Sequence, residues 1–457
     1  MLSVVVLAAG QGTRMRSSLP KVLHPIAGRP MLGYVLDTAR ALQPDAIYVV
    51  HGQGGERLRA QLPEPDIRWV EQAVPLGTGH ALQQALPAIT DDHQVLVLYG
   101  DVPLVRLQTL QSLRQAAGRE LGLLTALLAD PYGYGRIVRE EPSGSVVAIV
   151  EERDASAAQR SIREVNTGIL CLPAARARGW LDEVRCNNSQ GEYYLTDVIA
   201  LARQDGVAVH PLTVSDPIEV QGVNDRAQLA LVERAHQQRE AQRLMRSGVS
   251  LLDPARFDLR GRLVCGIDVT IDVNCIFAGE VELADGVYVG PNCLIRDSRI
   301  GANTHIASHC DIEGALIEGE SRVGPFARLR PGTRMASGSK VGNFVETKNA
   351  AIGQGSKVNH LSYVGDAQLG AGVNVGAGTI TCNYDGANKH HTVIEDDAFI
   401  GSGTQLVAPV RVGRGATIGA GSTIRRDAPA GALTLLEASQ KTIVGWRRPQ
   451  KKSKPEG

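Results

Sequence analysis

Residues that could bind phosphate cluster near the start of the chain. Positions 7–14 read Leu-Ala-Ala-Gly-Gln-Gly-Thr-Arg and follow directly on an apolar run, and Lys21 lies a few residues further on. Small residues let backbone amides approach an anion, while Arg14 and Lys21 add positive charge. The segment lacks the Gly-Lys-Ser/Thr of a P-loop and the third glycine of a dinucleotide fingerprint. It therefore predicts either a phosphate-binding loop of another kind or a plain tight turn.

A carboxylate and a histidine are candidates for two further roles. Asp101 comes just after the apolar run 95–99, and a carboxylate at the mouth of a parallel sheet suits a magnesium ion that bridges phosphates. The alternative is an aspartate that only opens a turn. His360 lies among basic and polar residues of neighbouring repeats, and histidine exchanges protons near neutral pH. A general base and a structural histidine both fit that position.

The first half of the chain has the pattern of an α/β domain. Apolar runs bounded by Gly, Pro or Asp predict strands at 3–7, 47–50, 95–99 and 121–128. The stretches between them predict helices at 31–41, 79–88 and 105–117. This alternation predicts a mostly parallel sheet covered on both faces, with ligands at the carboxyl ends of its strands.

A further helix is predicted after this region. Asp225, with Gln228 three residues later, has the pattern of a helix start, and Gly248 is a suitable stop. The helix is either a rigid connector or an ordinary amphipathic helix on the first domain.

From about residue 250 the apolar residues recur every six positions. The longest series are Ile271, Phe277, Leu283, Val289 and Ile295, and Ile394, Ile400, Leu406, Val412, Ile418 and Ile424. A β-solenoid with three short strands per coil places each sixth residue in a triangular core. The 50 glycines of the chain suit its corners. The register breaks at 381–393, which predicts an inserted loop.

Composition excludes several classes of function. Lys and Arg number 48, as do Asp and Glu, so the chain of 457 residues lacks the positive field of a nucleic-acid-binding protein. Its 7 cysteines include no Cys-x-x-Cys pair, which argues against a disulfide framework or a zinc ribbon. No apolar run is long enough for a spanning helix, and no export signal is visible. We therefore expect a cytoplasmic protein with no membrane insertion.

Several motifs resemble those of sugar-1-phosphate nucleotidyltransferases. They read Leu-Ala-Ala-Gly-x-Gly-Thr-Arg-Met at 7–15, Pro-Lys-Val-Leu at 20–23, Gly-Thr-Gly-His-Ala at 77–81 and Tyr-Gly-Asp-Val-Pro at 99–103. With the repeats behind them, the whole chain resembles bacterial bifunctional N-acetylglucosamine-1-phosphate uridyltransferase/glucosamine-1-phosphate N-acetyltransferases. The resemblance implies an α/β, Rossmann-like uridyltransferase domain at 1–226 and a helical linker at 227–247. It also implies an acetyltransferase domain at 248–457, a left-handed parallel β-helix of hexapeptide repeats with a basic tail.

The resemblance implies roles in joining UTP to N-acetylglucosamine-1-phosphate, which yields UDP-N-acetylglucosamine and pyrophosphate. Arg14 and Lys21 would grip the triphosphate and act in catalysis, and Asp101 and Asn224 would bind Mg²⁺. The nucleotide and the sugar would contact a wider set of residues: Leu7, Ala8, Ala9, Gly10, Gln72, Gly77, Thr78, Tyr99, Gly100, Gly135, Glu151 and Asn166.

For the transfer of acetyl from acetyl-CoA to glucosamine-1-phosphate, the resemblance makes His360 the general base. The sugar phosphate would be bound by Arg330, Lys348, Tyr363 and Asn374. Acetyl-CoA would be bound by Ala377, Asn383, Tyr384, Ser402 and Ala420. Glu437 stands where the family often has a basic residue, which puts a contact to the CoA phosphates in doubt. That contact could instead come from Arg425, Arg426 or the basic tail with Lys451, Lys452 and Lys454.

Hexapeptide acyltransferases that resemble this chain are trimers, so we expect a homotrimer through the solenoid. Two other hypotheses stay open from the sequence. One is a nucleotidyltransferase whose solenoid is only structural or regulatory, and the other is a non-enzymatic sensor of nucleotide sugars.

Overall fold

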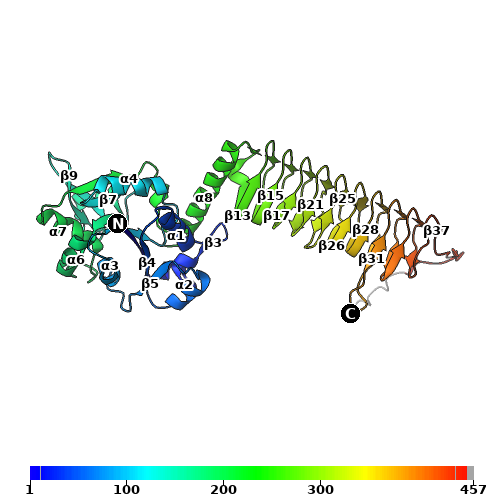
Figure 1. Ribbon diagram of the computed structural model, residues 1–457, viewed down its shortest axis with the longest axis horizontal. Coiled ribbons are helices and arrows are strands. Elements are labelled where there is room, and N and C mark those ends of the chain that lie inside the picture. Colours follow the sequence, from blue (N-terminus) through cyan, green and yellow to red (C-terminus); the bar gives the residue numbers. More distant parts are fainter. Residues whose placement is uncertain (11, 438, 450–457) are drawn as a thin grey trace, which may run out of the picture. The chain divides into compact units, whose positions relative to one another are not determined.

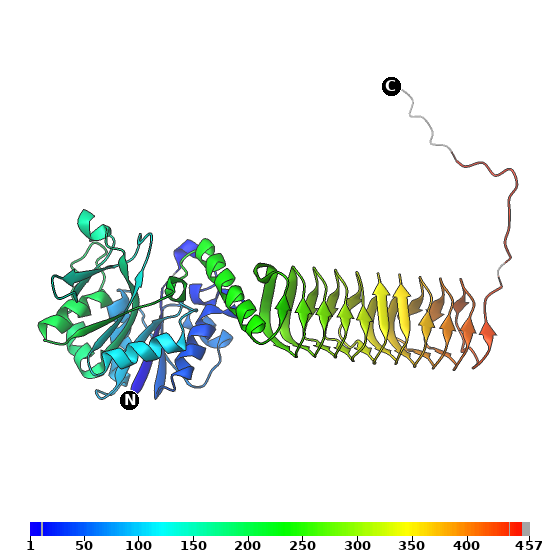
Figure 2. The same cartoon turned by 90° about the horizontal axis from the view of Figure 1, so that it is seen from above.

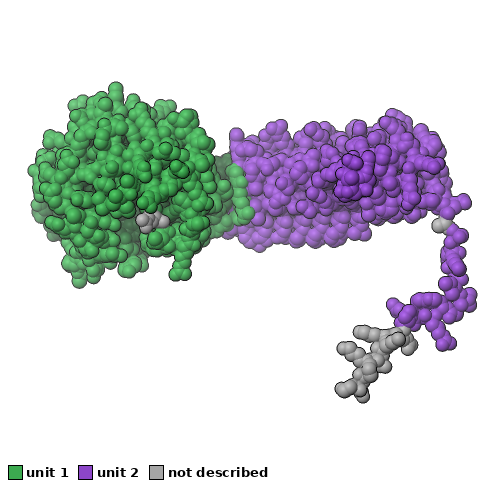
Figure 3. Space-filling model, turned by 90° about the horizontal axis from the view of Figure 1, so that it is seen from below, with its two compact units in different colours: residues 1–243, 258–261 green, residues 244–257, 262–457 purple. Residues whose placement is uncertain are grey.

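The computed structural model describes residues 1–10, 12–437 and 439–449, which divide into two compact units. Unit 1 comprises Met1–Arg243 with Asp258–Gly261, and unit 2 comprises Leu244–Phe257 with Arg262–Gly457. Figure 3 colours the two units separately. The domain limits expected from the sequence, 1–226 and 248–457 with a linker between them, stay a prediction.

A mostly parallel sheet forms the centre of unit 1 (Figure 1). Its strands follow the order β11-β7-β10-β6-β1-β4-β5, and β1 pairs in parallel with β4 and β6, whereas β10 is antiparallel to β6 and β7. The hairpin of β8 and β9 joins through β10. The strands of unit 1 are β1 (Leu2–Ala8), β2 (Pro25–Ile26), β3 (Arg29–Pro30), β4 (Ala46–His51), β5 (Ile67–Glu71), β6 (Gln94–Tyr99), β7 (Leu121–Leu127), β8 (Arg136–Glu140), β9 (Ser145–Val150), β10 (Glu164–Pro173) and β11 (Val209–Thr213).

Alternation along β1 explains how both faces of the sheet are covered. Val4 and Val6 lie in one apolar cluster with residues of α1 and α4, whereas Val5 and Leu7 lie in a second cluster with residues of α3, α6 and α7. Successive side chains of a strand point to opposite faces, so a near-continuous apolar run supplies both layers. The α-helices of the described chain are α1 (Met31–Ala41), α2 (Gly55–Gln61), α3 (Thr78–Ala85), α4 (Leu107–Ala117), α5 (Ala157–Arg160), α6 (Ala174–Glu183), α7 (Val198–Gln204) and α8 (Arg226–Arg246).

Helix α8 begins where the sequence predicts it. The Asp225 carboxylate accepts a hydrogen bond from the backbone N–H of Gln228 at 2.9 Å. The Gln228 side chain reaches back to the N–H of Asn224 rather than to that of Asp225, at 2.7 Å. Val232 is fully buried in an apolar cluster with Met15 and other residues of unit 1. The first turns of α8 therefore pack as an amphipathic helix on unit 1.

Unit 2 is a solenoid of short parallel strands, which Figure 2 shows as a regular stack of arrows. Each coil repeats after 17 or 18 residues, since Ile306 pairs with Val323 and Val323 with Val341. The residues predicted to recur every six positions point inward; Phe277 and Ile418, for example, have no exposed surface. The hexapeptide-repeat fold is thus confirmed, and its parallel strands are consistent with the expected left-handed β-helix.

Two ladders contain the strands of unit 2. The first comprises β12 (Ser250–Leu251), β14 (Thr270–Ile271), β16 (Tyr288–Val289), β19 (His305–Ile306), β22 (Arg322–Val323), β25 (Lys340–Asn343), β27 (Lys357–His360), β29 (Asn374–Val375), β32 (Phe399–Ile400), β35 (Thr417–Ile418) and β37 (Leu433–Thr434). The second comprises β13 (Phe257–Cys265), β15 (Cys275–Leu283), β17 (Leu294–Arg296), β18 (Arg299–Ile300), β20 (Asp311–Glu313), β21 (Leu316–Ile317), β23 (Arg328–Leu329), β24 (Arg334–Met335), β26 (Glu346–Ile352), β28 (Tyr363–Leu369), β30 (Ile380–Cys382), β31 (Thr392–Ile394), β33 (Gln405–Val407), β34 (Val410–Val412) and β36 (Thr423–Ile424).

The inserted segment lies between β30 and β31. Val358 pairs with Val375, but Val375 pairs with Ile400, so this coil is longer than its neighbours. The extra residues form a small hairpin in which Tyr384 bridges Lys389 in antiparallel fashion. The predicted break in the register therefore corresponds to an ordered hairpin inserted in one coil.

The chain beyond the last coil has no strand or helix as far as it is described, up to residue 449. Glu437 and Arg447 are exposed there, and the tail lysines Lys451, Lys452 and Lys454 lie outside the described residues. Within the described residues, no helix has both the length and the apolar character needed to cross a membrane.

Candidate functional site

A cavity of about 690 Å³ opens at the carboxyl ends of β1 and β6 in unit 1. It is lined by most of the residues predicted for nucleotide and sugar binding: Leu7, Ala8, Ala9, Gly10, Lys21, Gln72, Gly77, Thr78, Tyr99, Asp101, Gly135, Glu151, Asn166 and Asn224. The parallel strands β1, β5 and β6 end side by side, which brings together the residues that follow them. The antiparallel strand β10 and the hairpin of β8 and β9 add Asn166, Gly135 and Glu151.

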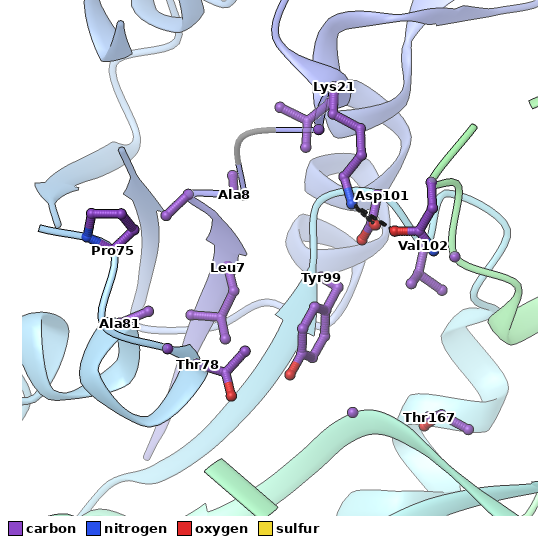
Figure 4. Close-up of a pocket in the computed structure, with 18 of the residues that line it drawn as sticks. Leu7, Ala8, Lys21, Pro75, Thr78, Ala81, Tyr99, Asp101, Val102 and Thr167 are labelled. Carbon is purple, nitrogen blue, oxygen red and sulfur yellow. Dashed lines mark hydrogen bonds and ion pairs between the residues drawn. The ribbon is translucent and has the colours of Figure 1, made fainter. Parts of the chain in front are cut away.

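Three polar side chains meet on one side of this cavity. The ammonium group of Lys21 donates to Asp101 Oδ2 at 2.5 Å and to Asn224 Oδ1 at 3.3 Å. Figure 4 shows Lys21 reaching toward Asp101 near Tyr99. The Lys21 and Asp101 side chains are only 14% and 12% exposed. Both oxygens therefore converge on one cation, at the place where the sequence predicts a metal site.

Two predicted residues do not line the cavity. Arg14 is exposed in a short 3₁₀ helix, Thr13–Met15. A side chain at Gly100 would come within 3.1 Å of Val22 and 3.3 Å of Ala8, so Gly100 lies behind the lining residues, where only glycine fits without displacement.

The end of the cavity near α3 has a closely packed backbone. The buried Gln72 side chain donates to the carbonyl of Gly77 at 3.0 Å. Gly77 has a φ of 111°, and a Cβ there would lie 2.6 Å from the carbonyl oxygen of Tyr193. The Thr78 hydroxyl accepts from the N–H of Leu195 at 3.1 Å. The chain thus needs glycine at position 77 to bring this loop against its neighbour.

A carboxyl group and an amide lie among the residues predicted for sugar binding. Burial raises the pKa of Glu151, although the Thr196 hydroxyl donates to its carboxylate at 3.2 Å. Asn166 accepts from the N–H of Gly168 at 2.9 Å. Burial also raises the pKa of Tyr99. These groups supply hydrogen-bond partners of the kind that a sugar hydroxyl or amide requires.

The second candidate site lies on the surface of the solenoid in unit 2. His360 is exposed at the end of β27, and its Nδ1 lies 2.5 Å from Asn343 Oδ1 on the preceding coil. An amide oxygen can only accept, so this contact places the proton on Nδ1 and leaves a lone pair on Nε2. A histidine held in this way can accept a proton from a bound substrate.

Positive charge gathers beside this histidine's coil. Arg330 donates to Glu346 at 2.8 Å. The charge of Lys389, on the inserted hairpin, and then that of Arg330 lower the pKa of Lys348. Cations that destabilise one another in this way favour an anionic ligand such as a phosphate.

The predicted acetyl-CoA contacts follow a line along the coils. The N–H of Gly378 donates to the carbonyl of His360, that of Gly403 to Ala377, and that of Gly421 to Ser402, at 2.7–3.2 Å. His360, Ala377, Ser402 and Ala420 therefore occupy equivalent positions on successive coils. Ser402 and Ala420 are exposed, whereas Asn383 is half-buried at the base of the hairpin and Tyr384 is 61% exposed.

Comparison with known proteins decides the family. The chain is 60% identical over 457 residues to the bifunctional protein GlmU of Alkalilimnicola ehrlichii, and the aligned region covers 100% of this chain and 98% of that protein. It is 58% identical over 451 residues to the bifunctional protein GlmU of an Azoarcus species, covering 98% and 100% of the two chains. The chain belongs to the bifunctional GlmU family. As a GlmU-family chain, it is a bifunctional enzyme with nucleotidyltransferase and acetyltransferase domains.

Two family models match the two parts of the chain separately. Residues 4–251 match the MobA-like NTP transferase domain, and residues 391–426 match the bacterial transferase hexapeptide of six repeats. Among solved structures, a UDP-glucose pyrophosphorylase complexed with UDP-glucose covers 52% of this chain at 17% identity, with a low TM-score of 0.43.

The structure of this GlmU-family chain adds residues that sequence reasoning missed. Further residues line the cavity: Gly12 and Thr13, which lie inside the motif at 7–15, and Gly133, Tyr134, Thr167, Gly168, Glu192 and Gly222, which lie outside the quoted motifs. Asn343 precedes His360 by one coil length, so the repeat itself could have shown that the two pair. Asp366 follows Asn349 by one coil length, so the repeat could have shown that pair as well, whereas the position of Lys389 depends on how the hairpin folds.

Proposed function

We propose that this enzyme makes UDP-N-acetylglucosamine in two steps. The solenoid transfers acetyl from acetyl-CoA to glucosamine-1-phosphate, and unit 1 then joins the product to UTP with release of pyrophosphate. The observation that carries the proposal is the pairing of two separate sites in one GlmU-family chain: the Lys21–Asp101–Asn224 cluster in a cavity, and His360 held by Asn343 on the solenoid. UTP and acetyl-CoA are cytoplasmic metabolites, which supports a cytoplasmic location.

Uridyl transfer requires positioning more than acid–base chemistry. An oxygen of the sugar phosphate attacks the α-phosphorus of UTP, and the bond to pyrophosphate breaks in line. That oxygen is already ionised, so no strong base is needed, and catalysis consists of aligning two polyanions and neutralising their charge. Lys21 and Arg14 supply positive charge. Gln72, Gly77 and Thr78 would hold the base and ribose, and Gly135, Glu151 and Asn166 the amino sugar.

The residues present fit a magnesium ion. Asp101 and Asn224 offer carboxylate and amide oxygens, the ligands that Mg²⁺ prefers, and both already reach one cation, the Lys21 ammonium group. When bound, Mg²⁺ would neutralise charge on the phosphates. Lys21 lines the same cavity and would bind the triphosphate.

Acetyl transfer requires a base for the attacking amine. The amine of glucosamine-1-phosphate attacks the thioester carbonyl, His360 Nε2 takes its proton, and the C–S bond to CoA breaks. The proton can return to the departing thiolate. Asn343 keeps the imidazole in the required tautomer, since it binds Nδ1. Arg330, Lys348, Tyr363 and Asn374 would hold the sugar phosphate, and the line from Ala377 to Ala420 with the hairpin would hold acetyl-CoA.

A coupled assay tests both activities on the same protein. With glucosamine-1-phosphate, acetyl-CoA, UTP and Mg²⁺, we expect release of free thiol and of pyrophosphate. His360→Ala should lower thiol release by about 10²–10⁴-fold, the usual loss for a general base, and leave pyrophosphate release from N-acetylglucosamine-1-phosphate and UTP intact. Pyrophosphate release without thiol release by the unaltered protein would favour the alternative of a nucleotidyltransferase with a structural solenoid.

We also propose a homotrimer through the solenoid. The residues proposed to bind acetyl-CoA lie on the open surface of one coil stack, whereas small-molecule sites are concave. Two solenoids packed side by side would form a groove along this line, and closed cyclic symmetry allows each chain to supply the same edge. Light scattering should give three times the chain mass of 48.7 kDa. Full acetyltransferase activity in a monomer would contradict the proposal.

A further inference from the structure

A buried carboxylate links three successive coils beside the acetyltransferase site. Asp366 lies in β28 and is only 9% exposed. Its Oδ1 accepts from the side-chain amide of Asn349 at 2.7 Å, and its Oδ2 accepts from that of Asn383 at 2.5 Å. Asn349 belongs to the preceding coil, and Asn383 opens the inserted hairpin. Both carboxylate oxygens of Asp366 are therefore used to join its neighbours.

The backbone at this corner has a left-handed conformation. Asp366 has a φ of 46° and Asn349 a φ of 45°, in the left-handed region that favours glycine. Earlier coils have either residue type at this corner: Gly314 and Gly332 have φ values of 57° and 83°, and Asp297 has a φ of 44°. An aspartate in this conformation carries strain that a glycine would not, and it persists where the surroundings compensate for it.

The partners of Asp366 stabilise the ionised form of its carboxyl group. Burial by itself would raise the pKa of the carboxyl group, but the hydrogen bonds from Asn349 and Asn383 and the charges of Lys389 and Lys348 lower it below its usual value. The group is therefore ionised at neutral pH, and it can accept hydrogen bonds on both sides.

Asn383 connects this carboxylate to the whole hairpin. The carbonyl of Asn383 accepts from the N–H of His390 at 2.8 Å, which closes the hairpin at its base. Tyr384 bridges Lys389 one step further out. Any shift of Asn383 would consequently move Tyr384 and Lys389 with it, and with them the charge beside Lys348.

We propose that Asp366 is a positioning residue for acetyl transfer, which fixes the inserted hairpin so that Asn383 and Tyr384 meet acetyl-CoA. The inference rests on the proposed acetyltransferase function, because the assignment of Asn383 and Tyr384 belongs to it. Asp366 does not touch the reacting atoms, and it acts through the amide of Asn383. A simple electrostatic role predicts the opposite effect, since loss of a negative charge would strengthen the binding of anionic substrates.

The test compares the single variant Asp366→Asn with a double variant in which the residues at positions 366 and 349 are exchanged. In Asp366→Asn, the new side chain has only one acceptor oxygen for the two donor amides of Asn349 and Asn383, so one of the two hydrogen bonds is lost. In Asp366→Asn/Asn349→Asp the carboxylate moves back by one coil, so the amide at position 366 can donate to it and still accept from Asn383. A matched control is Asp297→Asn, at the same corner of an earlier coil, where Asp297 has a φ of 44° and accepts from the N–H of Glu280.

We expect Asp366→Asn to lower kcat/KM for acetyl-CoA by roughly 10- to 100-fold, the scale of leaving one buried amide without its acceptor. KM for acetyl-CoA should rise. KM for glucosamine-1-phosphate should change less, and any change would report the shift of Lys389 beside Lys348. The swapped double variant should recover most of the loss, and Asp297→Asn should stay near the unaltered protein. Uridyl transfer by every variant reports that unit 1 is intact.

Hydrogen exchange provides a readout that needs no substrate. The amide of His390 should exchange faster in Asp366→Asn and regain its protection in the swapped variant. Unchanged kinetics and exchange in Asp366→Asn would overturn the inference, as would a lower KM for acetyl-CoA or a double variant without recovery. If the unaltered protein released no thiol, the proposed acetyltransferase function would fail instead, and the exchange data would still decide whether Asp366 holds the hairpin.

Discussion

Replacing Asp101 with asparagine removes one negative charge from the cavity while keeping its shape. The carboxylate accepts from Lys21 at 2.5 Å and lies next to the Asn224 oxygen that shares this lysine. Asparagine can still accept one hydrogen bond, but it offers a neutral oxygen to a metal ion or an ammonium group. The variant therefore separates the effect of charge from the effect of packing.

Two magnitudes follow from this geometry. Both side chains of the ion pair are nearly buried, at 14% and 12% exposed, and hydrogen bonds to charged groups contribute about 1.5–3 kcal/mol. We expect Asp101→Asn to destabilise unit 1 by up to that amount. Uridyl transfer should fall by about 10²–10³-fold, the usual loss when one electrostatic contact to a reacting group is removed. The Mg²⁺ concentration needed for half-maximal rate should rise as well.

The assay measures both activities of one preparation. Pyrophosphate release is followed over a range of Mg²⁺ concentrations, and thiol release from acetyl-CoA serves as the internal control because it depends on the other unit. Lys21→Met is the matched variant, since it removes the other half of the pair and no metal ligand. Equal losses of both activities in Asp101→Asn, or an unchanged Mg²⁺ dependence, would refute this account of the site.

Further expectations concern the two sites separately. Burial raises the pKa of Glu151 above its ordinary 4.5, so the folded state loses stability as the pH rises from 4.5 through the pKa of the folded protein. Glu151→Gln should therefore have a higher Tm than the unaltered protein near pH 8, but not near pH 4. Gly168 has a φ of 84°, and a Cβ there would lie 2.5 Å from the Tyr99 ring; Gly168→Ala should destabilise unit 1 by about 1–3 kcal/mol in thermal unfolding and lower uridyl transfer alone. Asn343→Ala frees Nδ1 of His360 and should lower the rate of thiol release by less than His360→Ala does; an equal or larger loss would contradict its role as an orienting group.

The fold was predictable where a period or an apolar run determines it. The strand at 3–7 is buried on both faces, so its composition alone indicates a covered parallel sheet, and the six-residue repeat leaves few alternatives to a solenoid. The antiparallel strand β10 was not predicted, since its apolar run resembles those of the parallel strands. The direction of pairing depends on how the chain returns to the sheet, and a single run of residues does not contain that information.

The candidate sites were predictable to different degrees for a physical reason. Residues of the cavity come from loops at one edge of a sheet, so each motif near a strand end is a candidate by its position. Arg14 shows the limit of this reasoning, because it lies next to the glycine loop in sequence but is exposed in a 3₁₀ helix outside the cavity lining. Which side of a short helix faces a cavity depends on its packing.

On the solenoid, residues that lie one coil length apart in the sequence are neighbours in space, and this spacing predicts which residues share a site. Asn343 and His360 pair because they occupy the same position on adjacent coils, and Ala377, Ser402 and Ala420 continue the same line. A straight line of residues on a convex stack has no walls of its own. The hairpin at Asn383 stands beside this line, and the proposed trimer would bring a second chain to its other side. The acetyltransferase site should therefore lose activity on dilution into monomers, whereas the cavity of unit 1, which is formed within one chain, should not.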